Sequence, residues 1–138
     1  TALRVTGNRE DAEDVVQTVF LRIWGNPDRL DPDRGAGAYL RRAATNAAVD
    51  ILRKRSSSKE SPMEDTVQFA APRQSPLLKA RLRQAIARLD PQDAELFLLR
   101  NIEGFTLPEL AEMLGMERST VGTRLFRIRQ FLQREIER

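Results

Sequence analysis

The stretch Thr106–Arg129, TLPELAEMLGMERSTVGTRLFRIR, predicts two helices joined by a tight turn. Thr106 and Glu109 stand at the spacing of a capping box, in which the two side chains satisfy backbone N–H groups at a helix start. Gly115 supplies the backbone freedom of the turn, and Ala111 is small enough to let two helices approach. After the turn, apolar residues recur at helical spacing. The pattern is typical of a helix-turn-helix, although plain helix packing can also produce it.

The second helix of such a pair would carry the contacts to DNA. In a helix-turn-helix, this helix lies in the major groove with its N-terminal residues toward the base edges. The polar side chains available for that role belong to Arg118, Ser119, Thr120, Thr123 and Arg124, with Arg127 further back toward the phosphates. We therefore expect this face of the helix to be exposed and to bind duplex DNA.

The sequence before this motif divides into further helical segments. Apolar residues at helical spacing predict helices over about 8–24, 38–55, 76–89 and 91–103. Asn8 is a suitable N-cap for the first of these helices, and Gly104 ends the last. Residues 2–5 resemble the end of a helix whose beginning is absent, and the chain opens without Met, so we expect an N-terminal truncation.

One long polar segment separates the helices into two groups. Residues 56–75, SSSKESPMEDTVQFAAPRQS, have no helical periodicity and are rich in Ser, Pro and acidic residues. The predicted fold is therefore all-α, with two small helical domains, residues 1–55 and 76–138, joined by a flexible linker over residues 56–75.

Composition excludes several kinds of chemistry. The 138 residues include no His and no Cys, so imidazole or thiol nucleophiles, Cys/His zinc sites and disulfides are absent from the chain. No apolar run approaches the roughly 18 residues of a membrane span. We expect a soluble cytoplasmic protein that is not an enzyme, with no catalytic residues, no metal, no cofactor and no membrane insertion.

The charge distribution adds a hint about partners. Lys and Arg number 23 against 20 Asp and Glu, so the net charge is only +3. The basic residues gather in two stretches, Tyr39–Lys59 and Arg118–Arg138. Such a pattern suits a nucleic-acid binder with two contact regions, and it also suits two solvated helix faces.

Three strings, in order along the chain, resemble the extracytoplasmic-function (ECF) group of bacterial sigma factors. GNREDAEDVVQTVFLRIW (Gly7–Trp24) resembles region 2.2, which docks on the clamp helices of the polymerase's largest subunit. YLRRAATNAAVDILRKR (Tyr39–Arg55) resembles regions 2.3 and 2.4, which hold the minus-10 element. LDPQDAELFLLRNIEGFTLPELAEMLGMERSTVGTRLFRIR (Leu89–Arg129) resembles region 4, which reads the minus-35 element.

The resemblance implies a role for particular residues. Contacts to core polymerase would come from Asp11, Glu13, Asp14 and Gln17. Contacts to minus-10 DNA would come from Tyr39, Asn46, Asp50, Arg53 and Lys54. The minus-35 contacts would come from the helix-turn-helix residues named above. Simpler explanations exist for some of these, because acids suit a first helical turn and Asn46 and Asp50 are spaced for a local hydrogen bond.

The chain departs from the family pattern at several positions. Thr18 stands where an acid is usual, and Tyr39 stands where Trp is more common. Arg118 and Gly122 replace an apolar residue and a Lys, and the loop Gly25–Gly37 has no aromatic residue to form a base pocket. These changes imply an altered polymerase contact and an altered promoter preference.

The resemblance also implies partners: the RNA polymerase core enzyme, promoter DNA and an anti-sigma factor. It implies promoter-specific transcription initiation under the control of that anti-sigma factor. Two other functions fit the same sequence. A sigma-like decoy would bind only a regulator, and an ordinary helix-turn-helix repressor would bind duplex DNA without polymerase.

Overall fold

The computed structural model describes residues 2–25, 36–57 and 76–137. Within these ranges every regular element is an α-helix, as the sequence predicts. The helices are α1 (Ala2–Thr6), α2 (Arg9–Gly25), α3 (Ala36–Ser57), α4 (Pro76–Arg88), α5 (Pro91–Asn101), α6 (Leu107–Leu114) and α7 (Arg118–Glu137). Most of the predicted linker and of the loop that precedes α3 lies outside the described residues. In the parts of the chain covered, no helix combines the length and the hydropathy that crossing a membrane requires.

The first three helices form one group. Asn8 caps α2 as predicted, because its Oδ1 accepts hydrogen bonds from the backbone N–H groups of Glu10 at 2.8 Å and Asp11 at 3.4 Å. Val15 and Val19 of α2 are buried against α3, whose own buried residues include Val49. The α3 helix continues to Ser57, two residues past the predicted end of the first domain.

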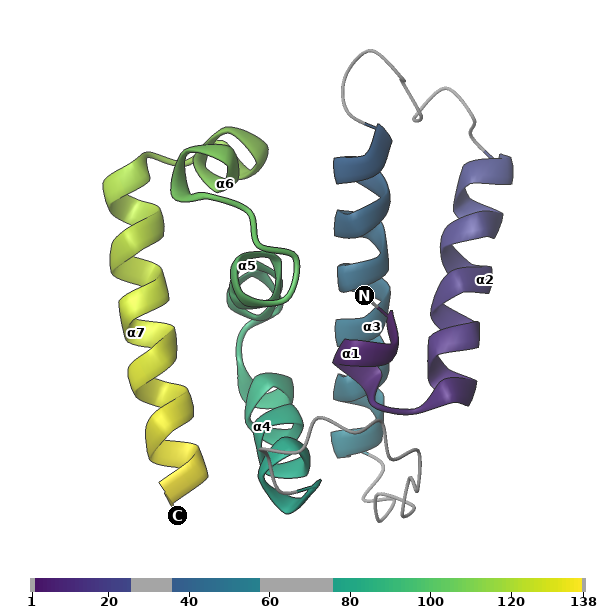
Figure 1. Cartoon of the computed structure of the whole chain (residues 1–138), viewed down its shortest axis with the longest axis horizontal. Helices are drawn as coiled ribbons and strands as arrows, with labels where there is room; N and C mark the ends of the chain where they lie inside the picture. The colour runs from purple at the N-terminus through teal and green to yellow at the C-terminus, as the bar shows by residue number, and fades with distance from the viewer. Residues whose placement is uncertain (1, 26–35, 58–75, 138) are drawn as a thin grey trace.

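The remaining helices form the second group, and Figure 1 shows α2 and α7 at opposite edges of the molecule. A buried stripe along α7, comprising Val121, Leu125, Ile128 and Leu132, packs against α4, α5 and α6. Leu99 in the last turn of α5 is fully buried. The periodicity seen in the sequence therefore gives the inward face of α7.

The two groups pack against each other through α3, which contacts both α4 and α5 (Figure 1). One continuous apolar cluster runs from Val15 through Leu52 and Ala85 to Val121. Sequence periodicity does not reveal this contact. Its physical reason is size, since a helical unit of about 60 residues buries little apolar surface alone and gains by covering its exposed face.

A tight turn joins α1 to α2 and also contacts the second group. Gly7 has φ 69°, a left-handed conformation that favours glycine. The Arg83 guanidinium of α4 lies against this turn, and Arg83 Nε donates to the Val5 carbonyl oxygen at 3.1 Å. The absence of a side chain at Gly7 therefore makes room for Arg83.

Candidate DNA and polymerase interfaces

The helix-turn-helix predicted from the sequence is formed by α6, the turn at Gly115 and α7. Thr106 and Glu109 make both hydrogen bonds of the capping box, from Glu109 N to Thr106 Oγ1 at 3.3 Å and from Thr106 N to Glu109 Oε1 at 3.0 Å. Gly115 takes φ 65° and ψ 36°, and Ala111 is buried where α6 meets its neighbours. The local prediction is confirmed.

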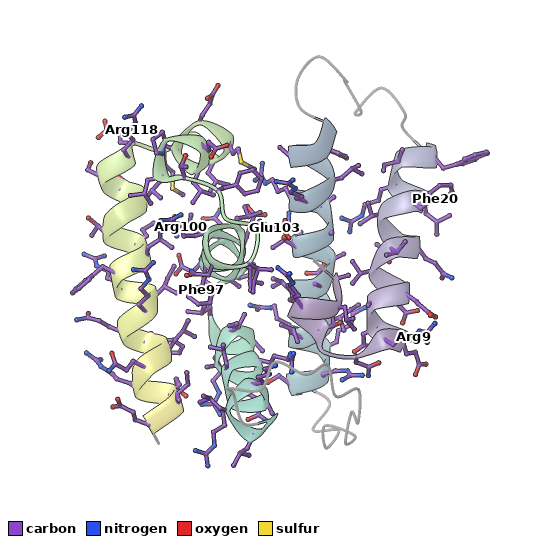
Figure 2. All side chains as sticks on the ribbon, viewed as in Figure 1. Arg9, Phe20, Phe97, Arg100, Glu103 and Arg118 are labelled. Atoms are coloured by element: carbon purple, nitrogen blue, oxygen red, sulfur yellow. The ribbon has the colours of Figure 1, made fainter. Side chains whose placement is uncertain are left out.

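The first turns of α7 present polar side chains to solvent. Exposed residues on this helix include Arg118, Ser119, Thr120, Thr123 and Arg127, and Figure 2 shows Arg118 at the end of α7 next to α6. The Thr123 hydroxyl donates to the Ser119 carbonyl oxygen at 2.9 Å, so its oxygen is left to accept from a ligand. The arrangement can bring several side chains to a DNA groove at once.

Phe126 is an exposed aromatic residue on the same helix, at 62% relative exposure. The sequence reasoning did not single it out. Its signal was available, because Phe126 falls out of phase with the buried stripe formed by Leu125 and Ile128.

Arg124 differs from the expectation of an exposed side chain. Its Nη2 lies 2.9 Å from Oδ1 of Asp93 in α5, and both side chains are only about a quarter exposed. Its Nη1 lies 3.8 Å from the sulfur of Met116 in the turn. The ion pair draws the guanidinium back toward the body of the domain.

The predicted minus-10 residues all lie on α3 but are not equally accessible. Asp50 and Lys54 are exposed, whereas Tyr39 and Asn46 are half-buried. The guanidinium of Arg53 donates from Nη1 to the Leu89 carbonyl oxygen at 2.8 Å. Arg53 is thus engaged by the second group of helices.

Two further arginines of α3 contact the second group. Arg42 Nη2 lies 3.2 Å from Oε1 of Glu95, whose side chain is 9% exposed. Arg41 pairs with Glu103 at 3.7 Å and lies over the Phe105 ring, 5.6 Å from its centroid. Sequence reasoning missed these pairs, although an acid at Glu95 inside an apolar stripe is a signal that a partner exists.

The predicted polymerase-binding residues divide into exposed and engaged ones. Asp14 and Gln17 are exposed on α2. Glu13 is also exposed and pairs with Arg9 of the same helix at 3.4 Å. Asp11, in contrast, is half-buried and pairs with Arg55 of α3 at 2.7 Å, so it helps to join α2 to α3.

An apolar patch lies on the exposed face of α2. We call it the α2 patch; its members are Val16, Phe20, Leu21 and Trp24, each at least 60% exposed. The rings of Phe20 and Trp24 stack with centroids 6.2 Å apart. Figure 2 shows Arg9 and Phe20 on α2, at the edge of the molecule opposite α7. Helical periodicity in the sequence predicts that Val16 and Phe20 share the inward face of Val15 and Val19, but the structure leaves both exposed.

Comparison with known proteins identifies the family to which the chain belongs. The family models for Sigma-70 region 2 and Sigma-70 region 4 match residues 1–58 and 79–132. The RNA polymerase sigma-E factor of Streptomyces coelicolor is 31% identical, and the match covers 99% of this chain and 77% of that relative. The chain belongs to the ECF sigma factor family.

Other relatives of this ECF sigma factor give the extent of the match. The ECF RNA polymerase sigma factor SigE of Mycolicibacterium smegmatis is 32% identical over 96% of the chain, and the chain spans about half of that relative's length, at 54%. The ECF RNA polymerase sigma factor SigW of Bacillus subtilis is 27% identical, and the match covers 96% of this chain and 79% of the length of SigW.

A solved structure of similar architecture is that of CnrH in complex with the cytosolic domain of CnrY. It is 30% identical to this ECF sigma factor, with a TM-score of 0.64 and coverage of 99% of this chain and 78% of that one. The similarity extends over both helical groups.

Proposed function

We propose that this ECF sigma factor directs promoter-specific transcription initiation by joining core RNA polymerase and contacting two promoter elements. The first group of helices would bind polymerase and the minus-10 element, and the second would bind the minus-35 element. The observation that carries the proposal is the helix-turn-helix with Arg118 and Thr120 exposed at the start of α7 and Arg127 exposed in its middle, in a chain that matches both sigma regions.

The α2 patch supports a polymerase-binding role for α2. Exposed apolar patches rimmed by polar residues mark protein interfaces. Here Asp14 and Gln17 are exposed on the same helix as the aromatic pair Phe20 and Trp24, with Gln17 three residues before Phe20. We propose that Asp14 and Gln17 contact polymerase at the rim of that patch. Glu13, exposed beside them, would add to the rim, while Asp11 would act mainly by holding α2 on α3.

On α3, the exposed residues Asp50, Arg53 and Lys54 would contact minus-10 DNA. Tyr39 and Asn46, half-buried on the same helix, would lie beside that contact. Opening duplex DNA costs about 1.4 kcal/mol per base step. A bubble of many base pairs therefore costs more than the contacts of one small helical unit return. Capture of one extruded base costs a few kcal/mol, comparable with one stacking contact. The chain would therefore act as part of the polymerase, trapping bases in a bubble that the larger enzyme holds open.

Release of α3 from the second group of helices is part of this proposal. Arg53 Nη1 donates to the Leu89 carbonyl oxygen, and we propose that Arg53 gives up this bond when its guanidinium turns to a phosphate. The ion pairs Arg42–Glu95 and Arg41–Glu103 oppose the same release.

A protein regulator fits the compact arrangement. The structure of CnrH was solved with the cytosolic domain of CnrY bound. By that likeness we infer an anti-sigma factor that binds this chain while its two groups of helices are together. The proposed activity needs no catalytic residue or cofactor, and it would take place in the cytoplasm with the polymerase.

The test is reconstitution with a bacterial core polymerase and run-off transcription from promoters that carry substitutions in either element. We expect Arg127→Ala to reduce transcription about fivefold or more, because a lost hydrogen bond to a charged phosphate costs about 1.5–3 kcal/mol. Arg134→Ala is the matched control, because Arg134 is exposed two turns further along α7 and its substitution removes the same charge. Equal transcription by both variants would favour the decoy, and tight duplex binding without polymerase would favour the repressor.

A further inference from the structure

The Arg124 guanidinium is contacted on two sides by residues of the second group of helices. Asp93 Oδ1 lies 2.9 Å from Nη2, and the Met116 sulfur lies 3.8 Å from Nη1. Asp93 comes from the first turn of α5 and Met116 from the turn of the helix-turn-helix. The direction of this side chain therefore depends on α5 as well as on its own helix.

The position of Arg124 on α7 explains why its direction matters. Val121, Leu125 and Ile128 form the buried stripe, whereas Thr123 and Arg127 are exposed. Arg124 lies between these two faces and is half-buried. A long side chain at such an edge can follow the protein surface or reach toward the groove, and its neighbours decide which.

The guanidinium keeps donors for a second partner while Asp93 holds it. Arginine has five N–H donors in a rigid plane. One of them points to the Met116 sulfur, whereas the contact to Asp93 Oδ1 is an ion pair without the angle of a hydrogen bond, so most donors remain available. Reading a guanine takes two of these donors in a fixed orientation. A carboxylate that holds the guanidinium in one place would prepare that orientation before DNA arrives.

The negative charge of Asp93 favours a role in orienting Arg124 over a role in attracting Arg124 to DNA. A carboxylate next to a DNA-binding arginine cancels its charge and lowers the attraction for phosphates. An acid in the first turn of α5 also suits the helix dipole, which would be a purely structural role. The two roles predict different effects on sequence preference.

We propose that Asp93 is a positioning residue that orients the Arg124 guanidinium to read a base of the minus-35 element; this inference rests on the proposed function. Arg124 would contact the base, and Asp93 would act only through Arg124. The pair would then contribute to sequence discrimination more than to affinity.

The experiment compares Asp93→Asn with Asp90→Asn in holoenzyme assembled from the chain and core polymerase. Asp90 is the N-cap of the same helix, and its side chain makes no cap hydrogen bond, so the control changes the same charge at the same helix start. Binding is measured on promoter duplexes with each base pair of the minus-35 element substituted, and on a duplex without promoter elements. Thermal unfolding of each variant is followed alongside.

We expect Asp93→Asn to reduce discrimination about fivefold or more at the base pair where Arg124→Ala does the same. It should also tighten binding to the duplex without promoter elements and steepen its salt dependence by up to about 0.9 in slope, because a freed Arg124 can reach a phosphate. Asp93→Asn combined with Arg124→Ala should match Arg124→Ala alone. Asp93→Glu, which keeps the charge, should retain more of the discrimination.

Other outcomes contradict the inference. If Asp93→Asn and Asp90→Asn have the same base preferences, or if Asp93→Asn lowers only the unfolding temperature, Asp93 has a structural role alone. Should Asp93→Asn fail to fold, Asp93→Ala, which also removes the carboxylate, takes its place: base preferences equal to those of Arg124→Ala would support orientation by Asp93, and unchanged preferences would overturn it. A holoenzyme that already ignores the minus-35 sequence without substitution contradicts the proposed function itself.

Discussion

Arg42 of α3 and Glu95 of α5 form an ion pair that joins the two groups of helices. The distance from Arg42 Nη2 to Glu95 Oε1 is 3.2 Å, and Arg42 Nε donates to the same oxygen at 3.2 Å. Because the Glu95 side chain is 9% exposed, its charge has little access to water. The pair therefore makes the packing of α3 on α5 specific, whereas apolar contacts alone would allow sliding.

Removing Arg42 should destabilise the folded chain. Arg42→Met leaves the Glu95 carboxylate buried without this partner, and we expect a loss of about 1–3 kcal/mol in the free energy of unfolding, since a buried polar group then stays unsatisfied. Urea unfolding measures the loss. Arg42→Met combined with Glu95→Leu should recover part of it, because apolar replacement of both partners is often neutral. If the double variant shows the sum of the two single losses, the two residues are not energetically coupled.

The α2 patch should be needed for polymerase binding and not for folding. Phe20→Ser should weaken binding to core polymerase about tenfold or more, because stacked aromatic residues at the centre of an interface often contribute more than 1 kcal/mol each. Its unfolding temperature should change little, since Phe20 is 60% exposed. Leu77→Ser is the control, because Leu77 is equally exposed on α4. Titration of labelled core polymerase checks both variants, and equal affinities would exclude the patch from the interface.

Gly122 should tolerate a larger residue with a gain in stability. No atom lies within 4 Å of a Cβ built at this position in α7. Gly122→Ala should therefore stabilise the fold by up to about 1 kcal/mol, the helix-propensity difference between the two residues.

Gly7→Ala should have the opposite effect and destabilise the fold. The positive φ at this position costs about 1–2 kcal/mol for alanine, and a Cβ there would displace the Arg83 guanidinium. Thermal or urea unfolding of both variants gives the two signs. A destabilising Gly122→Ala would show that α7 has a constraint at this position other than helix propensity.

Acid should weaken the capping box of α6. Hydrogen bonds from the backbone and side chain of Thr106 hold the pKa of Glu109 below its usual range. A carboxylate with a lowered pKa stabilises the fold above its unfolded pKa of about 4.3, and the contribution is lost as the pH falls through the lower pKa of the folded state. The unfolding-temperature difference between the unsubstituted chain and Glu109→Gln should thus be constant near pH 7 and shrink below about pH 4. A difference that persists undiminished at pH 3 would contradict this.

Local features of the fold could be predicted from the sequence, because their partners are a few residues apart. The Asn8 cap, the Thr106–Glu109 capping box and the turn at Gly115 all follow from spacing alone. The buried stripe of α7 follows from its periodicity in the same way. These elements were enough to predict the helix-turn-helix.

Features that depend on distant parts of the chain could not be predicted. Arg53 is 36 residues from Leu89, and no local rule connects a guanidinium to a carbonyl so far away. The same holds for Asp93 and Arg124, whose pairing withdraws a side chain expected to be exposed. Val16 and Phe20 fall near the edge of the apolar face of α2, and only the placement of α3 decides that they stay exposed.

The hydrogen bond from Arg53 to the Leu89 carbonyl oxygen links the position of this guanidinium to the packing of α3 against the second group of helices. If Arg53 gives up this bond to contact promoter DNA, whatever tightens the contact between α3 and the α4–α5 junction weakens the affinity for DNA by the same factor, and DNA weakens that contact in return. A regulator could then silence the protein without covering any DNA-contacting side chain, simply by preferring the closed form.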